Sequence, residues 1–185
     1  MKDIEAKNYL VNLIKNIDSY ALKVFLILRI KLLPLDAYYQ KMYLKNKIIE
    51  IGCGHGLVSA YLALRLPNNK IIGLDPDIKR ISFAKKNFSS IKNLEFLNEK
   101  PNIKNTSKAD VFIFIGVLYL MSDSDLKNML KILRINLNKD GFIYVSEIKK
   151  ERIYNIKYIF HLIREYCLKY INFTKGSVIK PRNLA

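Results

Sequence analysis

Apolar side chains recur at helical spacing near the start of the chain, where polar residues separate them: Ile4, Val11, Ile14 and Ile17. This spacing predicts a helix over residues 3–17. Residues 19–33 predict a second, more apolar helix, which Pro34 ends because proline cannot continue a helix. A short aromatic segment, residues 36–44, follows. The chain therefore opens with a helical lead-in before its first strand.

Beyond this lead-in, short apolar runs alternate with stretches of helical periodicity. The runs predict strands over residues 47–51, 70–75, 94–98, 109–118 and 142–148. Helices are predicted over residues 57–66, 76–88, 122–137 and 151–171, and turns over residues 67–69 and 138–141. Strands that alternate with helices of this length predict βαβ units. We therefore expect an α/β fold with a doubly wound, mostly parallel sheet covered on both faces.

A glycine-rich turn joins the first strand to the helix that follows it. The sequence there reads I-I-E-I-G-C-G-H-G, with Gly52, Gly54 and Gly56. Glycine allows a sharp turn and lets a ligand approach where a Cβ would collide. The start of the next helix adds free N–H groups and the positive end of the helix dipole. The turn therefore predicts a site for an anionic or carboxylate-bearing, nucleotide-like ligand at the carboxyl end of the strand.

An acid at the end of the second strand makes this interpretation more specific. Asp75 follows Gly52 by 23 positions, and its carboxylate can accept hydrogen bonds from both hydroxyls of a ribose. The spacing G-x-G-x-G differs from the dinucleotide pattern G-x-G-x-x-G, so a dehydrogenase is a disfavoured alternative. Glu50 would face a pyrophosphate badly but suits a ligand that carries an ammonium group. S-adenosylmethionine has such an ammonium, together with a carboxylate, a sulfonium and a ribose.

Residues 48–148 resemble the class I, Rossmann-like S-adenosylmethionine-dependent methyltransferases. The segment E-I-G-C-G-H-G resembles the first motif of that family, and I-I-G-L-D-P-D resembles the second. The segment A-D-V-F-I-F-I-G-V-L-Y-L resembles the fourth-strand motif, and L-N-K-D-G-F-I-Y-V-S-E resembles the turn and fifth strand. The resemblance implies S-adenosylmethionine as the cofactor and methyl transfer as the activity.

The resemblance also implies which residues bind the cofactor. In chain order they are Glu50, Gly52, Cys53, Gly54, Gly56, Asp75, Pro76, Asn98, Glu99, Ile115 and Gly116. In the family pattern the glycine turn packs against the methionine moiety, Glu50 orients the ammonium, and Asp75 holds the ribose.

The remaining implied contacts concern the adenine and the reactive end. Pro76 or Asp77 flanks the adenine. The family often has an acid after the third strand that binds the adenine amino group, and this chain reads L-N-E-K there. Asn98 and Glu99 are therefore both left as candidates. Backbone atoms of Ile115 and Gly116 line the reactive end in the family pattern.

No catalytic residue is identified from the sequence. Alignment of the acceptor supplies much of the rate of methyl transfer, and a base is needed only when the acceptor must lose a proton. Tyr119 stands where many relatives have a histidine, and Glu147 ends the fifth strand, so these two are the candidates. Packing is the competing role for Tyr119, and it is the favoured role for His55 and His161. Cys53 is not expected to be a nucleophile because no general base is evident beside it.

The length predicts a single domain in three parts. Residues 1–45 are expected to be a helical lid, residues 46–148 the cofactor-binding core, and residues 149–185 a helix and tail. The family sheet usually ends in a β-hairpin of two more strands, and too few residues follow the last predicted helix to form both. We therefore expect a missing or shortened hairpin and an open sheet edge that an oligomer could cover.

The net charge of +16 leaves several acceptor classes open. The chain holds 25 Lys, 26 Ile and 17 Asn, a bias typical of AT-rich genomes, so part of the charge reflects codon usage. The favoured acceptor is a small or lipid-like molecule, with basic, apolar lead-in helices able to contact an anionic membrane. RNA is an alternative that the charge supports, although G-V-L-Y stands where a base-amine methyltransferase would have an N-P-P-Y-type motif. A non-catalytic cofactor-binding partner subunit is the third possibility.

The cysteines and the first residues bear on location. Cys53 and Cys167 are far apart and have no metal-binding spacing, so neither a disulfide scaffold nor a metal site is expected. The segment M-K-D-I-E-A-K-N-Y-L has no apolar signal core. These features predict a cytoplasmic protein, with peripheral contact at the inner membrane surface as an option.

Overall fold

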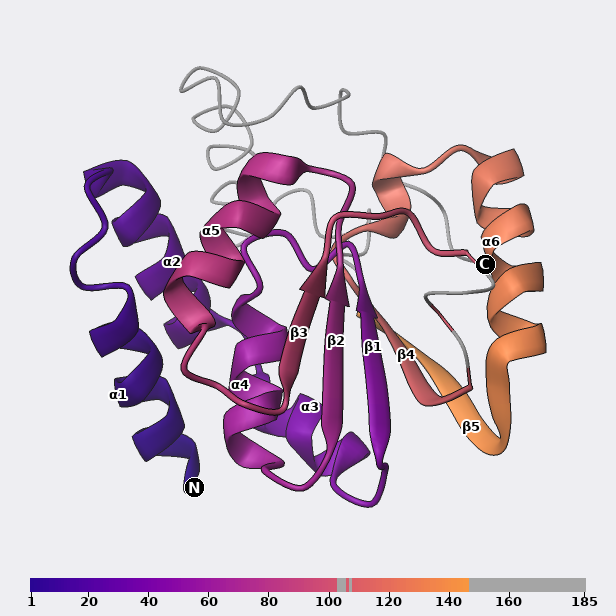
Figure 1. The fold of residues 1–185 in the computed structure, drawn as a ribbon, viewed down its shortest axis with the longest axis horizontal. Coiled ribbons are helices and arrows are strands. Elements are labelled where there is room, and N and C mark those ends of the chain that lie inside the picture. The colour runs from indigo at the N-terminus through magenta and orange to yellow at the C-terminus, as the bar shows by residue number, and fades with distance from the viewer. Residues whose placement is uncertain (103–105, 107, 147–185) are drawn as a thin grey trace, which may run out of the picture.

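A five-stranded parallel sheet forms the centre of the computed structural model, which describes residues 1–102, 106 and 108–146 (Figure 1). Its strands are β1 (Lys47–Ile51), β2 (Lys70–Leu74), β3 (Leu94–Leu97), β4 (Ala109–Ile115) and β5 (Leu137–Ser146). They lie in the order β3-β2-β1-β4-β5, and every pairing is parallel. This confirms the predicted α/β class. The segment in which the hairpin was expected to be missing or shortened, Glu147 and the predicted helix over residues 151–171 all lie outside the described residues.

The helices are α1 (Asp3–Leu13), α2 (Tyr20–Leu32), α3 (Leu35–Met42), α4 (Leu57–Arg65), α5 (Ile78–Phe88) and α6 (Asp123–Asn136), with a 3-10 turn, η1 (Leu118–Leu120). Side-chain caps explain where several of them begin. Ser19 accepts a hydrogen bond from Leu22 N at the start of α2, and Ser122 accepts one from Asp125 N at the start of α6. No helix among the described residues is long and apolar enough to cross a membrane.

The structure refines one local prediction and corrects another. The aromatic segment after Pro34 is a helix, α3, because Leu35, Tyr38 and Met42 recur at helical spacing and all three are buried. The turn predicted over residues 138–141 lies inside β5, which already begins at Leu137. The register with β4 jumps from the pair Ala109 and Leu137 to the pair Val111 and Phe142, so residues 138–141 form a bulge at the start of the strand.

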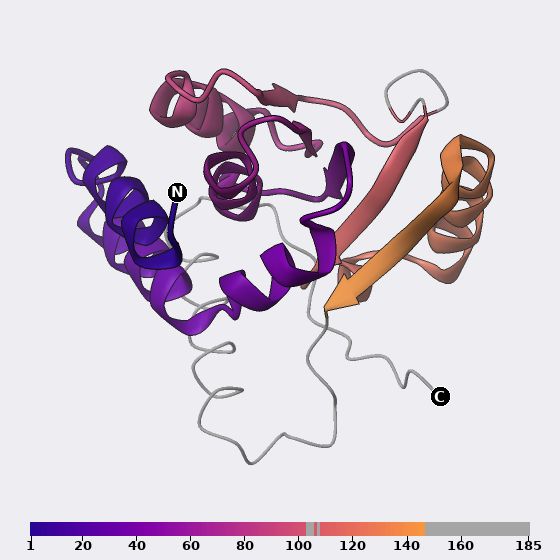
Figure 2. The same ribbon diagram turned by 90° about the horizontal axis from the view of Figure 1, so that it is seen from below.

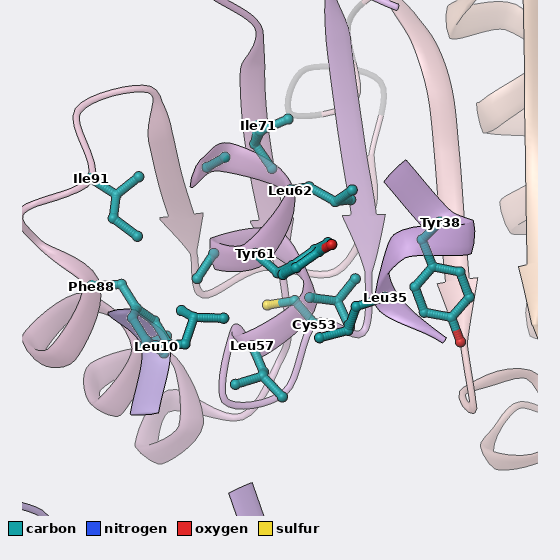
Figure 3. Close-up of a cluster of buried hydrophobic side chains, with 14 of the residues drawn as sticks. Leu10, Leu35, Tyr38, Cys53, Leu57, Tyr61, Leu62, Ile71, Phe88 and Ile91 are labelled. Carbon is teal, nitrogen blue, oxygen red and sulfur yellow. The ribbon is translucent and has the colours of Figure 1, made fainter. Parts of the chain in front are cut away.

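The two faces of the sheet are covered by different helices (Figure 2). One face packs against α1 to α5, and the other packs against α6. In the close-up, Leu10 of α1 and Leu35 of α3 lie in the same cluster as Leu57, Tyr61 and Leu62 of α4 (Figure 3). The lead-in is therefore part of the core on the face from which Glu50 projects.

Polar contacts also fasten the lead-in to α4. The Tyr61 hydroxyl donates to Asp3 Oδ1 at 2.6 Å. The guanidinium of Arg65 forms an ion pair with Asp36 at 2.8 Å and stacks over the ring of Tyr39 at 3.8 Å. These contacts set the position of α1 and α3 against the helix that follows the glycine turn.

The strand order identifies where a ligand is expected to bind. The chain moves from β1 outward to β2 and β3, and then returns to the other side of β1 for β4 and β5. The connections leaving β1 and β4 therefore run to opposite sides, and sheets of this kind bind ligands in a crevice at the carboxyl ends of these two strands. The glycine turn and the segment after Ile115 both lie at this edge of the sheet.

Candidate functional site

The glycine turn leaves β1 in a left-handed conformation and is held against β2. The φ angles of Gly52, Gly54 and Gly56 are +72°, +57° and +77°. The N–H groups of Gly52 and Cys53 both donate to Leu74 O, at 2.7 and 3.0 Å. Because L-residues with side chains rarely adopt such φ values, the glycines fit this backbone for a conformational reason.

The glycines differ in what a side chain would meet. A Cβ on Gly52 would lie 2.7 Å from both methyl groups of Val117, and one on Gly56 would overlap the ring of Phe96. At Gly54 the nearest atom would be Nη1 of Arg80 at 4.0 Å, and at Gly116 nothing lies within 4 Å. Gly52 and Gly56 are therefore required by packing. A Cβ on Gly54 would make one ordinary contact with Arg80 and one on Gly116 would meet no atom, so a ligand has room to approach the backbone at these two positions.

Glu50 is a buried acid just before the turn, only 2% exposed. Its Oε2 accepts hydrogen bonds from the N–H of Ser59 at 2.9 Å and from the hydroxyl of Ser59 at 2.5 Å. Since Gly56 has no side chain to cap α4, Glu50 takes that role for the first turn of the helix. Both hydrogen bonds end on Oε2, so Oε1 keeps its lone pairs for a ligand.

Burial controls the charge of Glu50. Desolvation raises its pKa from 4.5 to about 7, although the hydrogen bonds from Ser59 and the charge of Arg29 act in the opposite direction. Near neutral pH the carboxyl is therefore balanced between its two protonation states. A cation placed beside it would favour the carboxylate.

Asp75 is a second buried acid, on the other side of the turn. Its Oδ2 accepts from the N–H of Gly54 at 2.8 Å, and its Oδ1 accepts from the N–H of Asp77 at 2.8 Å. Each oxygen still has one lone pair, so the carboxylate can accept two further hydrogen bonds, as a vicinal diol would require. Asp75 thus links the glycine turn to the start of α5 and remains able to bind a ligand.

The predicted adenine residues surround the end of β2. Pro76 is exposed, and the amide of Asn98 donates to Asp75 O at 3.0 Å. Glu99 is exposed and accepts a hydrogen bond from Asn102 at 3.3 Å. The carboxylate of Asp77 is engaged as the cap of α5, because it accepts from the N–H groups of Lys79 and Arg80. Asn98 and Glu99 thus remain alternative candidates for the adenine amino group.

The segment after β4 lies at the same edge of the sheet. Ile115 ends the strand, Gly116 has a φ of +63°, and its N–H donates to Ser146 O at 2.9 Å. Tyr119 lies in the short 3-10 turn η1 and is half-buried. The predicted acceptor-facing candidate Glu147 follows Ser146 and lies outside the described residues, as does His161.

The other chemically reactive side chains of the turn serve packing. His55 is buried between two aromatic rings in edge contacts, with Phe25 of α2 at 6.2 Å and Phe83 of α5 at 5.2 Å between ring centroids. Burial raises the pKa of the Cys53 thiol well above its usual range, so little thiolate exists at neutral pH. Neither residue is arranged as a nucleophile or a base.

Two arginines near the turn were not singled out from the sequence. Arg29 projects from α2, its guanidinium lies 5.7 Å from the ring of Phe25, and its charge lowers the pKa of Glu50. Arg80 projects from α5 toward the open space at Gly54 and pairs with Asp77 at 3.4 Å. One available signal was composition, because arginine is rare in a chain whose basic residues are mostly lysine.

Comparison with known proteins identifies the family of this arrangement. The model of a family described as a methyltransferase domain matches residues 49–143, about half of the chain. Malonyl-[acyl-carrier protein] O-methyltransferase 1 of Ilyobacter polytropus is 31% identical over 80 residues, which cover 43% of this chain and 30% of that protein. The match thus spans under a third of the length of that curated relative.

Solved structures share the fold at low sequence identity. A plantazolicin methyltransferase, solved with a triazolic desmethylplantazolicin analogue and SAH, superposes with a TM-score of 0.55 at 21% identity, covering 80% of this chain and 60% of that one. A coclaurine N-methyltransferase, solved with N-methylheliamine and SAH, superposes with a TM-score of 0.54 at 16% identity, covering 62% and 35%. These likenesses concern the fold.

Proposed function

Because this chain belongs to the class I, Rossmann-like S-adenosylmethionine-dependent methyltransferases, we propose that it transfers a methyl group to a small-molecule or lipid-like acceptor at the crevice beside the glycine turn. The observation that carries the proposal is the pairing of two buried acids, Glu50 and Asp75, around a turn whose central glycine borders open space. These residues fit S-adenosylmethionine, which carries an ammonium for one acid and a ribose diol for the other.

Each end of the cofactor has a proposed partner in this chain. Glu50 Oε1 would bind the ammonium, and Asp75 would accept from the ribose hydroxyls. The cofactor carboxylate would meet the N-terminal end of α4 and the guanidinium of Arg29. Gly54 and Gly116 would allow the methionyl part to approach the backbone closely.

The chain's own contribution to the transfer is alignment. S-adenosylmethionine, when bound, supplies a methyl group on a sulfonium whose departure leaves a neutral thioether. The residues at the ends of β1 and β4 would hold the acceptor in line, which provides much of the rate in a displacement of this kind. Tyr119 and Glu147 are the proposed groups for removing a proton from an acceptor hydroxyl or amine.

The nature of the proposed acceptor follows from the rim of the crevice and from the relatives. Ile78 at the start of α5 and Leu120 after β4 are exposed apolar side chains on the segments that border the crevice. The relatives act on malonyl-acyl carrier protein, coclaurine-type amines and plantazolicin, as their names state. An apolar rim and relatives of this kind favour a small or lipid-like acceptor over RNA.

Calorimetric titration of the full chain with S-adenosylmethionine, S-adenosylhomocysteine and NAD tests the proposal. Binding of the first two without NAD supports it, and binding of NAD alone would favour a dehydrogenase. A chain that binds none of them by itself would instead fit a subunit that needs a partner. RNA binding with a steep salt dependence would favour the RNA alternative.

Replacing Asp75 with alanine is expected to weaken S-adenosylhomocysteine binding about 10- to 100-fold, since charge-assisted hydrogen bonds to the ribose contribute about 1.5–3 kcal/mol. Asp110→Ala is the control. It removes an acid that accepts hydrogen bonds from the N–H groups of Asn46 and Lys47 at the start of β1, and leaves the Asp75 carboxylate in place. Equal affinity of Asp75→Ala and the unaltered chain in calorimetry would refute the ribose assignment.

The affinity for S-adenosylmethionine is expected to fall with pH below about 7. The pKa of Glu50 is near 7 without ligand, and an adjacent ammonium would lower that pKa, so binding at lower pH must first remove a proton. As the pH falls from 7 to 5.5, the dissociation constant should rise by up to about tenfold for each pH unit. Titrations in two buffers of different ionisation enthalpy would detect the released proton, and a flat profile would contradict the role of Glu50.

A further inference from the structure

Helix α2 has an apolar face turned away from the rest of the protein. Tyr20, Val24, Leu28 and Leu32 recur every four residues and are 78%, 37%, 43% and 63% exposed. Residues at this spacing form one ridge along a helix. Most exposed apolar residues of a soluble protein are scattered singly, whereas a contiguous row of them marks an interaction surface. We call these four residues the α2 ridge.

The opposite face of α2 is also apolar. Leu22, Leu26 and Ile30 are buried in the core together with α1, α3 and α4. A helix that is apolar all round is expected to be buried all round. The described residues bury one side only, so the α2 ridge needs a second apolar environment.

The charges within α2 have one sign, although Asp18 precedes the helix by two residues. The helix contains Lys23, Arg29 and Lys31 and no acidic residue. Lys31 is exposed between ridge positions, and Lys23 lies half-buried at its margin. Lysine side chains beside an apolar stripe can bury their stems and extend their ammonium groups into a layer of negative headgroups. The net charge of +16 adds a long-range attraction to any anionic surface.

We propose that the α2 ridge docks on a bilayer that contains anionic lipids. The helix has 13 residues and a length of about 20 Å, which is too short to span a bilayer but suits a helix lying in the headgroup region. Complementary charge favours this occupant over a second copy of the chain, which would bring the same cations face to face.

The position of the ridge deepens the proposed function. On its inner side α2 contacts the glycine turn through Phe25 and His55, and its Arg29 influences Glu50. One helix, about 10 Å in diameter, therefore separates the bilayer from the turn. Docking does not depend on the proposed function, but delivery of a lipid-like acceptor from the bilayer to the crevice does rest on it.

Vesicle flotation of the full chain tests the docking. Vesicles of phosphatidylglycerol and phosphatidylcholine should bind the protein at least tenfold more strongly than phosphatidylcholine alone, and the double variant Leu28→Glu/Leu32→Glu should lose at least tenfold. The control is Leu130→Glu/Ile135→Glu, which makes the same charge change at two exposed apolar positions of α6, on the other face of the sheet. Its binding should stay within about twofold of the unaltered chain.

Three results would overturn the docking proposal. They are an equal loss of vesicle binding in both double variants, unchanged vesicle binding in the α2 variant, or a stable dimer of the unaltered chain that the α2 substitutions abolish. Melting temperatures are compared first, and Leu32→Glu alone, at the more exposed position, replaces the double variant if that one unfolds. S-adenosylmethionine titration without lipid is measured for every variant. Cofactor binding without vesicle binding would refute only the docking proposal. Vesicle binding without cofactor binding would refute only the proposed function.

Discussion

Replacing Glu50 with glutamine is expected to stabilise the ligand-free protein at pH 8 and to weaken S-adenosylmethionine binding about 100-fold. The folded pKa of Glu50 is raised to about 7 from a usual value of 4.5, chiefly by burial. Between these two pH values Glu50 is therefore protonated in the folded state but largely ionised in the unfolded state. The contribution of Glu50 to the free energy of unfolding is therefore most favourable below pH 4.5 and falls as the pH rises to about 7.

The size of the two effects follows from the cost of the buried charge. Holding this carboxylate ionised above pH 7 costs on the order of 3–4 kcal/mol of folding free energy, at about 1.4 kcal/mol for each unit by which the pKa is raised. Glutamine avoids most of this cost and still accepts from Ser59, so the cap of α4 is preserved. Affinity falls because an amide replaces the charge-assisted bond to the ammonium, a loss near the upper end of about 1.5–3 kcal/mol.

Urea denaturation and calorimetry at pH 8 and pH 5 measure both effects. The Glu50→Gln variant should be more stable at pH 8 and nearly equal to the unaltered chain at pH 5. Its affinity should lose the pH dependence expected between pH 7 and 5.5. Glu95→Gln is the matched control, since this acid is exposed on β3 and pairs with Lys70 at the surface. A Glu50→Gln variant that binds the cofactor as well as the unaltered chain would refute the ammonium assignment.

The fold was predictable because its strands and helices have clear local patterns. The strands are continuous apolar runs, and parallel strands buried on both faces need no alternation to be recognised. Helix α3 was expected only as part of the helical segment over residues 1–45, because its buried Tyr38 and Met42 lie in a stretch that reads as aromatic and polar. Residues 138–141 contain Asp and Gly, which indicate a turn, and in the structure they form a bulge at the start of β5, between the paired residues Leu137 and Phe142.

The candidate site was predictable only as far as it is local in sequence. Glu50, the glycines and Asp75 lie within one βαβ unit, and their spacing indicates a cofactor site without knowledge of the sheet. Arg29 is separated from Glu50 by α3 and β1, and only the packing of α2 brings its charge to that acid. The sequence pattern does not distinguish the three glycines of the turn. In the structure a Cβ would clash at Gly52 and Gly56 but not at Gly54.

This separation can be tested by placing one methyl group at two of the glycines. Gly56→Ala is expected to lower the free energy of unfolding by about 3–5 kcal/mol. The residue has a φ of +77°, and its new Cβ would overlap Phe96 and lie 2.9 Å from the Cβ of Ala84. Gly54→Ala, with a φ of +57° and no atom closer than 4.0 Å, should cost only about 1–2 kcal/mol.

Gly54→Ala should be the less destabilising of the two variants, yet it should weaken cofactor binding directly. The methyl group of Gly54→Ala would occupy the space proposed for the methionyl part of the cofactor, so S-adenosylhomocysteine should bind at least tenfold more weakly to a chain that is still folded. Gly116→Ala, which also adds a methyl group to open space at positive φ, should behave as Gly54→Ala does. Denaturation curves and calorimetry on the three variants measure this. If Gly54→Ala keeps full affinity while Gly56→Ala unfolds, the turn serves the packing of α4 and α5, and the cofactor must lie elsewhere along the carboxyl edge.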